Sequence, residues 1–517
     1  MKTTKISLKE TGKFSSMFLE YLEGSESLSS FYRASPAIEN FKEIIENHQI
    51  SGSTRITLSE ELQAEYGALE CHESVQSNIH ALRDAKTFTV TTGHQLNIFT
   101  GPLYFIFKIA TAINLAKKLK AEYPDYHFVP VYWMASEDHD FEEISYFNLF
   151  GKKYTWETEQ TGAVGRFAPQ SLNTVLEQMP ECPELFEKAY LDSSSLAEAA
   201  RIYVNELFGE HGLVVVDADN PKLKAEFTSI IKDDLQNHHA NRLVEATNQK
   251  LIDAGYKSQA FSREINFFLL NGYRERIVKE SGNYKINNSD ESFSEEDILK
   301  LVDSNPEKFS PNVIMRPVYQ EVILPNLAYI GGPAEIVYWL QLKDVFDHYD
   351  VSFPILMPRN FGMIINKGQQ KKIDKLGLDS EMLFMDTHDI KSWYISTHSD
   401  NEHLLDEEKE HITEVYNRVK QKAGSIDKSL EGFIGSENAK ALKAFENIEK
   451  RLKKAQESQN ETALNQIDAI KDKLFPGGGL QERSDNFLNF YLNNPKFIDQ
   501  LLAEFDPFEF NFYKFWE

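Results

Sequence analysis

Two clusters of titratable side chains follow apolar runs in the first third of the chain. The sequence TGHQ at residues 92–95 comes after the run at 87–91, and EDHD at 137–140 comes after the run at 128–133. A histidine beside a glycine turn suits donation to a phosphate or to a developing oxyanion. Carboxylates beside a histidine suit proton transfer or the binding of a divalent metal.

Each cluster also has a structural interpretation. His94 would then only cap a turn, and the second cluster would be a solvated loop before a helix. Because both clusters follow neighbouring predicted strands, we favour function, with Glu137 and Asp140 as supporting groups. The residues predicted to be catalytic are His94, Asp138 and His139.

The elements around these clusters have a strand–helix–strand pattern. Between the two apolar runs lies a stretch with Ile106, Ile109 and Ile113 on one helical face, and a third apolar run follows at 213–216. This pattern predicts a parallel sheet in an α/β fold. Ligands of such sheets bind outside the carboxyl ends of the strands, where both clusters fall. The polar stretches 151–193 and 279–310 look like irregular insertions into one sheet domain, residues 1–390.

Arginines and a glycine turn in the middle of the chain are candidates for anion binding. Guanidinium groups grip carboxylates with paired hydrogen bonds, although each arginine could equally form a structural ion pair. We expect both arginines at strand ends, and the Gly-Gly-Pro at 331–333 predicts a helix start with free amides. The predicted substrate-binding residues are Gly93, Gln95, Arg316, Gly331, Gly332, Glu335, Tyr338 and Arg359.

Composition excludes several classes of protein. The 517 residues carry a formal charge of −25, which argues against a nucleic-acid partner because phosphate binding relies on lysine and arginine. The two cysteines, Cys71 and Cys182, have no metal-ligand or disulfide spacing, and Cys71 is interpreted as a structural thiol rather than a nucleophile. No segment resembles a signal peptide or a membrane span, so we expect a cytoplasmic protein.

The last quarter of the chain has the pattern of a coiled coil. Apolar residues recur at spacings of three and four between 412 and 474, with lysine and glutamate between them. Gly432 and Gly435 interrupt the first run, which predicts that the helix turns back there as an antiparallel hairpin, residues 391–476. The aromatic segment 477–517 is expected to return to the core. Its candidates for binding a nucleotide, against the alternative of a plain flexible turn, are Gly478, Gln481 and Arg483.

Several blocks together resemble the cysteine-adding enzyme family of bacillithiol biosynthesis, BshC. The resemblance implies a Rossmann-like core with connecting-peptide insertions, an antiparallel coiled coil and a homodimer. It also implies the last step of the pathway, the joining of L-cysteine to the amine of glucosaminyl-malate, with ATP or ADP as the cofactor to consider. The blocks are TGHQ at 92–95, TGPLY at 100–104, PVYW at 130–133, EDHD at 137–140, RP at 316–317, GGPAEIVYW at 331–339 and QER at 481–483.

Alternatives from other classes stay open at the level of sequence. A metal-dependent hydrolase would use His94, Asp138, His139 and Asp140 as ligands, although we make no firm metal prediction. A nucleotidyltransferase-like enzyme would act on another small anionic substrate. A coiled-coil scaffold would need no pocket, and the polar clusters at several strand ends argue against it.

Overall fold

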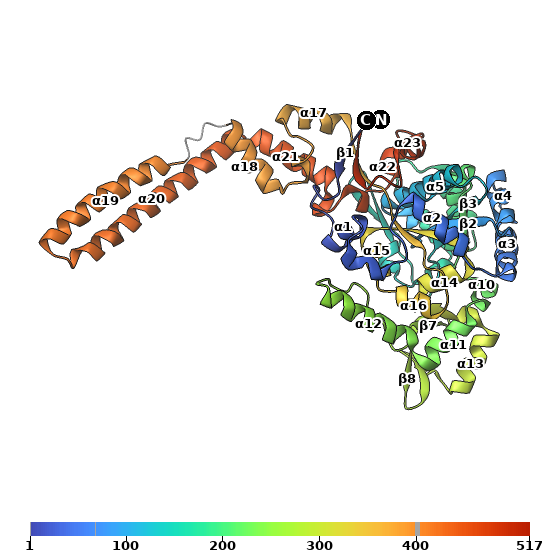
Figure 1. The fold of residues 1–517 in the computed structure, drawn as a ribbon. Coiled ribbons are helices and arrows are strands. Elements are labelled where there is room, and N and C mark those ends of the chain that lie inside the picture. Colours follow the sequence, from blue (N-terminus) through green and yellow to red (C-terminus); the bar gives the residue numbers. More distant parts are fainter. Residues whose placement is uncertain (1, 68, 399–403) are drawn as a thin grey trace. The chain divides into compact units, whose positions relative to one another are not determined.

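The computed structural model describes residues 2–67, 69–398 and 404–517 (Figure 1). Contacts divide the chain into two units. The core unit comprises Met1–Met363 and Gln481–Phe515, and the hairpin unit comprises Ile364–Leu480 with the last two residues. The expected boundaries at 390/391 and 476/477 therefore differ from this division, which falls at Ile364 and Gln481. No helix of the described residues is long and apolar enough to cross a membrane.

A five-stranded parallel sheet forms the centre of the core unit. Its order is β13 (Ile355–Pro358), β12 (Asn326–Gly331), β2 (Thr87–His94), β3 (His127–Met134) and β6 (Val214–Asp217). The chain adds β3 and β6 on one side of β2 and then β12 and β13 on the other. The strand order thus reverses between β2 and β12, and in open α/β sheets ligands bind at such a reversal.

Burial on both faces explains why these strands are continuous apolar runs. Every residue of β2 is buried, and helix α5 (Tyr104–Glu122) is buried along most of its length. The core between them includes Val90 from β2, Leu115 from α5 and Ile330 from β12. The Rossmann-like parallel sheet expected from the sequence is confirmed.

The structure corrects the predicted position of His94. Strand β2 continues through Gly93 and His94, which pair with Trp133 and Met134 of β3, instead of ending before a turn. A loop with a 3-10 turn, η3 (Ile98–Thr100), then separates the strand from α5. The amides at the start of α5 are therefore not adjacent to His94 in the chain.

The stretch from 267 to 311 is also regular rather than irregular. It forms a five-stranded antiparallel sheet in which Tyr284 and Ile286 are buried while Asn283 and Lys285 are exposed. Positive φ angles of 51° and 85° at Ser281 and Gly282 make the hairpin turn. Its elements are β7 (Phe267–Leu270), β8 (Arg274–Glu280), β9 (Asn283–Ile286), β10 (Ser292–Phe293), α13 (Glu295–Ser304) and β11 (Phe309–Pro311).

Helices surround the central sheet, and the N-terminal strand and most of the aromatic tail belong to the core unit. Strands β1 (Lys2–Ser7) and β15 (Asn511–Trp516) pair, and Phe505 and Phe512 of the aromatic tail are buried. The N-terminal region contributes the helices α2 (Phe41–Asn47), α3 (Gly52–Tyr66) and α4 (Glu73–Ala81). Later helices of the core unit are α10 (Pro221–Ala225), α11 (Thr228–Asn237), α12 (His239–Asp253), α14 (Met315–Ile323), α15 (Pro333–Trp339) and α16 (Lys343–His348).

Long helices form the hairpin unit. Helices α19 (Asp406–Ile426) and α20 (Leu430–Gln459) lie side by side and antiparallel, and α21 (Glu461–Leu474) follows (Figure 1). The turn is made by residues 427–429, where the Asp427 carboxylate accepts from the Ser429 N–H at 2.8 Å. Gly432 and Gly435, expected to mark this turn, lie inside α20, because a helix tolerates glycine at a cost of only about 1 kcal/mol. The predicted antiparallel helical hairpin is confirmed.

Candidate functional site

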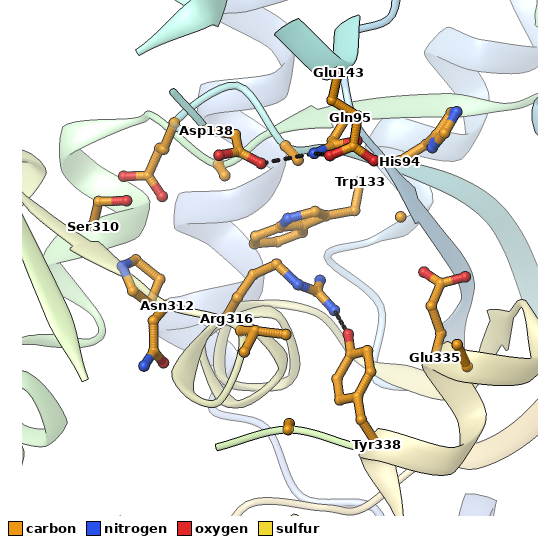
Figure 2. A pocket seen from close by; sticks show the side chains of 18 of the residues that line it. His94, Gln95, Trp133, Asp138, Glu143, Ser310, Asn312, Arg316, Glu335 and Tyr338 are labelled. Carbon is orange, nitrogen blue, oxygen red and sulfur yellow. Dashed lines mark hydrogen bonds between the residues drawn. The ribbon is translucent and has the colours of Figure 1, made fainter. Parts of the chain in front are cut away.

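A cavity of about 790 Å³ opens at the carboxyl edge of the sheet, where the strand order reverses (Figure 2). Four predicted site residues, His139, Gly331, Gly478 and Gln481, are not among the described residues that line it. The predicted residues that do line it are Gly93, His94, Gln95, Asp138, Arg316, Gly332, Glu335, Tyr338, Arg359 and Arg483.

His94 is the last residue of β2 and is 9% exposed. Its ring packs between Tyr104 and Phe105, with ring centroids 5.3 and 5.2 Å away. Burial, with the charges of Lys108 and Arg359, lowers its pKa well below 6.5. The ring is therefore neutral at neutral pH, and its buried Nε2 atom has no hydrogen-bond partner among the described residues. A neutral imidazole with a free nitrogen can exchange a hydrogen bond with a bound ligand.

Asp138 lines the same side of the cavity as His94, and its carboxyl group is stabilised in the ionised form. The Gln95 side chain donates to it at 2.9 Å, as shown by a dashed line in Figure 2, and the His139 backbone N–H donates at 2.7 Å. Burial acts to raise the pKa of Asp138, but the His139 side chain, 3.6 Å away, together with these hydrogen bonds and the charge of Arg274, outweighs it and lowers that pKa. A carboxylate stabilised in this way is a weak proton acceptor and a good partner for a cation.

Glu137, expected only to support the cluster, lines the cavity and is 6% exposed. Its carboxylate is paired with the buried ammonium of Lys224 from α10. Burial nevertheless raises the pKa of Glu137 to about 7, against the opposing effect of Lys224. Of the two EDHD residues that line the cavity, Glu137 and Asp138, Glu137 is therefore the one suited to exchange a proton near neutral pH. Asp140 caps the short helix α6 (Phe141–Ile144) by accepting from the Glu143 N–H.

His139 was predicted to face the ligand, but its side chain does not line the cavity. Its side chain is 47% exposed, and its Nδ1 atom is 3.0 Å from the Arg274 guanidinium. Arg274, from β8, also donates to the Ser310 hydroxyl and to the Pro311 carbonyl, each at 3.0 Å. Successive residues of a turn point in different directions, so Asp138 and His139 could not both face the ligand. Arg274 could not be predicted as a site residue from the sequence, because its buried charge follows from tertiary contacts alone.

Arg316 lines the opposite wall, as Figure 2 shows. It lies in the first turn of helix α14 rather than at a strand end, because the Asn312 side chain accepts from the N–H groups of Ile314 and Met315 and starts a helix there. Its guanidinium donates to Gln320 at 3.1 Å and to the Tyr338 hydroxyl at 3.3 Å. No carboxylate of the described residues lies within 4.0 Å of it.

The glycine turn does not present the free amides that were predicted. The Gly332 N–H donates to the Glu335 carboxylate at 2.6 Å, so this amide is already bonded within the protein. Glu335 also accepts from Tyr329 at 3.0 Å and pairs with the buried Lys108 ammonium at 2.7 Å. Gly331 is a buried residue of β12 whose carbonyl accepts from the Arg359 N–H.

Lys108 is a second residue of the site that was not among the predicted ones. It is 3% exposed, and its ammonium donates to the Gly93 carbonyl at 2.8 Å as well as pairing with Glu335. Burial lowers its pKa. A signal was present in the sequence, because Lys108 is the only charged residue between 104 and 116 in an otherwise apolar helix.

Two further arginines reach the cavity from different segments. Arg359, which follows β13, pairs with the fully buried Glu482 at 2.6 Å, and its buried Nε atom has no hydrogen-bond partner among the described residues. Arg483 lies over the Tyr104 ring, 5.8 Å from its centroid, and lines the cavity. Gln481 is buried beside it in the chain, and Gly478 belongs to the hairpin unit.

The metal-ligand set of the hydrolase alternative is not formed. Across the described residues, one group of three metal-ligating side chains brings its ligand atoms within 4.8 Å of one another, and it contains none of His94, Asp138, His139 and Asp140. The cavity instead combines a neutral imidazole, a stabilised carboxylate, a carboxyl that titrates near neutral pH and arginines.

The fold and the site define an α/β protein of the Rossmann-like class with a charged cavity at its topological switch point and an added helical hairpin. The sequence model of the N-terminal Rossmann-like domain of bacillithiol biosynthesis BshC matches residues 1–360, and that of the C-terminal coiled-coil domain matches residues 362–515. The chain belongs to the BshC family of bacillithiol biosynthesis.

Relatives from several bacteria match over nearly the whole chain. A protein of Flavobacterium psychrophilum is 44% identical over 98% of both chains, and one of Cytophaga hutchinsonii is 41% identical over 98% of this chain and 97% of its own. A protein of Staphylococcus carnosus is 29% identical over 92% of each. All three carry the name "Putative cysteine ligase BshC".

Proposed function

We propose that the chain catalyses the last step of bacillithiol synthesis, which joins L-cysteine to the amine of glucosaminyl-malate. The observation that carries the proposal is the Arg316 guanidinium, a cavity-lining cation whose hydrogen bonds go to the neutral groups of Gln320 and Tyr338. A cation held by neutral partners is suited to a carboxylate of the malate. Membership of the family and the names of the relatives support the same reaction.

The reaction requires an activated acid and a free amine. In our proposal ATP is the co-reactant: the cysteine carboxylate attacks a phosphorus atom and releases either ADP or pyrophosphate. The amine nitrogen then attacks the carboxyl carbon, which breaks its bond to the oxygen that leaves on phosphate or on AMP. The nitrogen loses one proton in this step, so the site must supply a group that accepts it.

Glu137, Asp138 and His94 would each have a separate role when the amine attacks the carboxyl carbon. Glu137 accepts the proton, since a pKa of about 7 means that its carboxylate form is populated near neutral pH and can still be protonated there. Asp138, the stabilised anion, accepts a hydrogen bond from the neutral amine and orients it for the attack. Neutral His94 donates a hydrogen bond to the oxygen that becomes negative as the nitrogen attacks.

The test combines product formation with substrate binding. The purified protein is incubated with cysteine, glucosaminyl-malate and ATP, and the thiol product and the released nucleotide are measured by mass spectrometry. We expect cysteine-dependent product, and we expect Arg316→Ala to weaken glucosaminyl-malate binding by about 10–100-fold, the loss typical of a charged hydrogen bond.

The matched control is Arg33→Ala, which removes an exposed arginine outside the cavity and should leave both measurements unchanged. Product formation by Arg316→Ala at the rate and affinity of the unmodified protein would exclude the proposed malate site. Absence of product with ATP and with every other nucleoside triphosphate would exclude ATP-type activation.

A further inference from the structure

A second cluster of chemically competent side chains lies outside the cavity, where helices α11, α12 and α16 meet. Asp233 comes from the last turns of α11, His239 is the first residue of α12, and His348 is the last residue of α16. One ligand atom from each lies within 4.8 Å of the others. None of the three lines the cavity, and the proposed reaction uses none of them.

The distances between these ligand atoms fit a small metal ion with tetrahedral coordination. The His239 Nδ1 atom is 3.0 Å from an Asp233 carboxylate oxygen, and the His348 Nε2 atom is 3.8 Å from the same oxygen. Zinc bonded at about 2.0–2.1 Å to nitrogen and oxygen separates neighbouring ligand atoms by about 3.3 Å in a tetrahedron. The two observed distances bracket that value, so small rotations of the side chains would close the site.

The backbone between α11 and α12 is shaped to bring two of these ligands together. His238 has φ 54° and ψ 35°, a left-handed conformation that residues other than glycine seldom adopt. This residue turns the chain sharply between the helices, so His239 returns to the side of Asp233. The strain is local and is stabilised by the packing of α12 against α16.

Neighbouring donors fix the carboxylate. The Tyr349 hydroxyl donates to one oxygen of Asp233 at 2.8 Å, and the Asn237 side chain donates to the other at 2.8 Å. Such outer contacts orient metal ligands in known sites. The side chains of Asp233, His239 and His348 are 23%, 34% and 34% exposed, so an ion can reach them from solvent.

We propose that Asp233, His239 and His348 bind one divalent transition-metal ion of the zinc type. Two imidazoles and one carboxylate favour zinc or its neighbours over magnesium or calcium, which prefer oxygen ligands. Three protein ligands leave the fourth position to water. The ion ties the corner between α11 and α12 to the end of α16.

The test uses the full chain, stripped of metal by a chelator and titrated with zinc against a chromophoric competitor. We expect the unmodified protein to bind one more equivalent of zinc than the variant H239Q/H348Q. Each single substitution should lower the zinc affinity of this site by at least about 10–100-fold, because losing even a residue that only supports a metal ligand costs that much. Cobalt should give a visible absorption band of a tetrahedral complex that the double variant lacks.

The control is His80→Gln, which removes an exposed histidine of α4 and should leave the zinc stoichiometry unchanged. Circular dichroism checks that each variant is folded. If the double variant does not fold, Asp233→Asn keeps the size and hydrogen-bond acceptor of the side chain and should also lose the equivalent. Equal zinc affinity and stoichiometry in the unmodified protein and a folded variant would overturn the proposal.

Discussion

At the scale of single residues, the cavity holds three titratable groups in three different states. His94 is neutral because burial disfavours its charged form, and Asp138 is ionised because donors surround it. Glu137, one residue before Asp138 and paired with Lys224, titrates near neutral pH. Side chains with separated pKa values in one cavity can take separate parts in an acid–base reaction.

Replacing His94 by alanine should lower product formation by about 10²–10⁴-fold, the range for a positioned acid–base or hydrogen-bonding group. The melting temperature should fall moderately, because alanine removes the ring that packs against Tyr104 and Phe105, although the Nε2 atom has no hydrogen-bond partner to lose among the described residues. His139→Ala should have a smaller effect, since His139 contacts Arg274 rather than the cavity. Steady-state kinetics and thermal unfolding test both, and an unimpaired His94→Ala enzyme would remove His94 from the reaction.

The rate should rise with pH as Glu137 loses its proton, with a midpoint near 7. The sign follows because the raised pKa keeps Glu137 protonated, and unable to accept a proton, below that pH. Glu137→Gln should abolish this rise and lower the rate. Glu65→Gln is the matched control, because burial also raises the pKa of Glu65 to about 7 but Glu65 lies outside the cavity. An unchanged pH profile in Glu137→Gln would reject Glu137 as the base.

At the scale of elements, β2, α5 and α15 are joined by one buried ion pair. Lys108 projects from α5, bonds the Gly93 carbonyl of β2 and pairs with Glu335 of α15. These contacts hold the ends of β2 and β12 at a fixed separation where the cavity opens. Lys108 therefore positions the site, although its ammonium is already paired and offers little to a ligand.

Lys108→Met should destabilise the core unit by up to about 3–5 kcal/mol, because it leaves the partly buried Glu335 carboxylate without its cation. The double variant K108M/E335L should recover part of that loss, since both charges are removed. Lys117→Met, at an exposed position of the same helix, is the control and should be nearly neutral. Urea unfolding measures all three, and a double variant less stable than the sum of its single substitutions would contradict a favourable pair.

Arg483 belongs to the short segment η10 (Gln481–Arg483), which brings the C-terminal part of the core unit to the cavity. If a nucleotide binds there, Arg483→Ala should weaken ADP binding by about 10–100-fold through the loss of a charged hydrogen bond. Calorimetry with ADP is the measurement, and Arg33→Ala serves again as the reference. Equal ADP affinity in both variants would place the nucleotide elsewhere.

At the scale of the whole molecule, the hairpin unit leaves apolar side chains uncovered. Helices α19 and α20 contain no buried residue, and Val419, Ile426 and Phe433 are 42%, 83% and 60% exposed. Regularly spaced apolar residues on paired helices are typical of a surface that another helix covers.

We therefore expect a homodimer in sedimentation at micromolar concentration, with contacts made by the hairpin. Val419→Glu should shift the protein toward the monomer, because the carboxylate would be buried in the contact. Gln421→Glu adds the same charge on the same helix and should not. A monomeric unmodified protein would contradict the homodimer, and a dimer unaffected by Val419→Glu would place its contacts outside the hairpin.

The parallel sheet and the helical hairpin could be predicted from the sequence, because both depend on periodic burial. Runs such as 128–133 are apolar throughout since both faces of a central strand are covered, and the spacing after 412 repeats with the helical turn. The predicted sheet also brought His94 and Asp138 to one edge, because the carboxyl ends of parallel strands meet there.

Which polar groups face the cavity without a protein partner depends on contacts between distant parts of the chain. The sequence could not show that Glu335 accepts from the Gly332 amide, that Glu482 pairs with Arg359 or that His139 contacts Arg274 outside the cavity. These partners are distant in the chain or depend on the direction in which one side chain points. Hydrogen bonds and pKa values are set by such neighbours in space, so a local pattern carries no record of them.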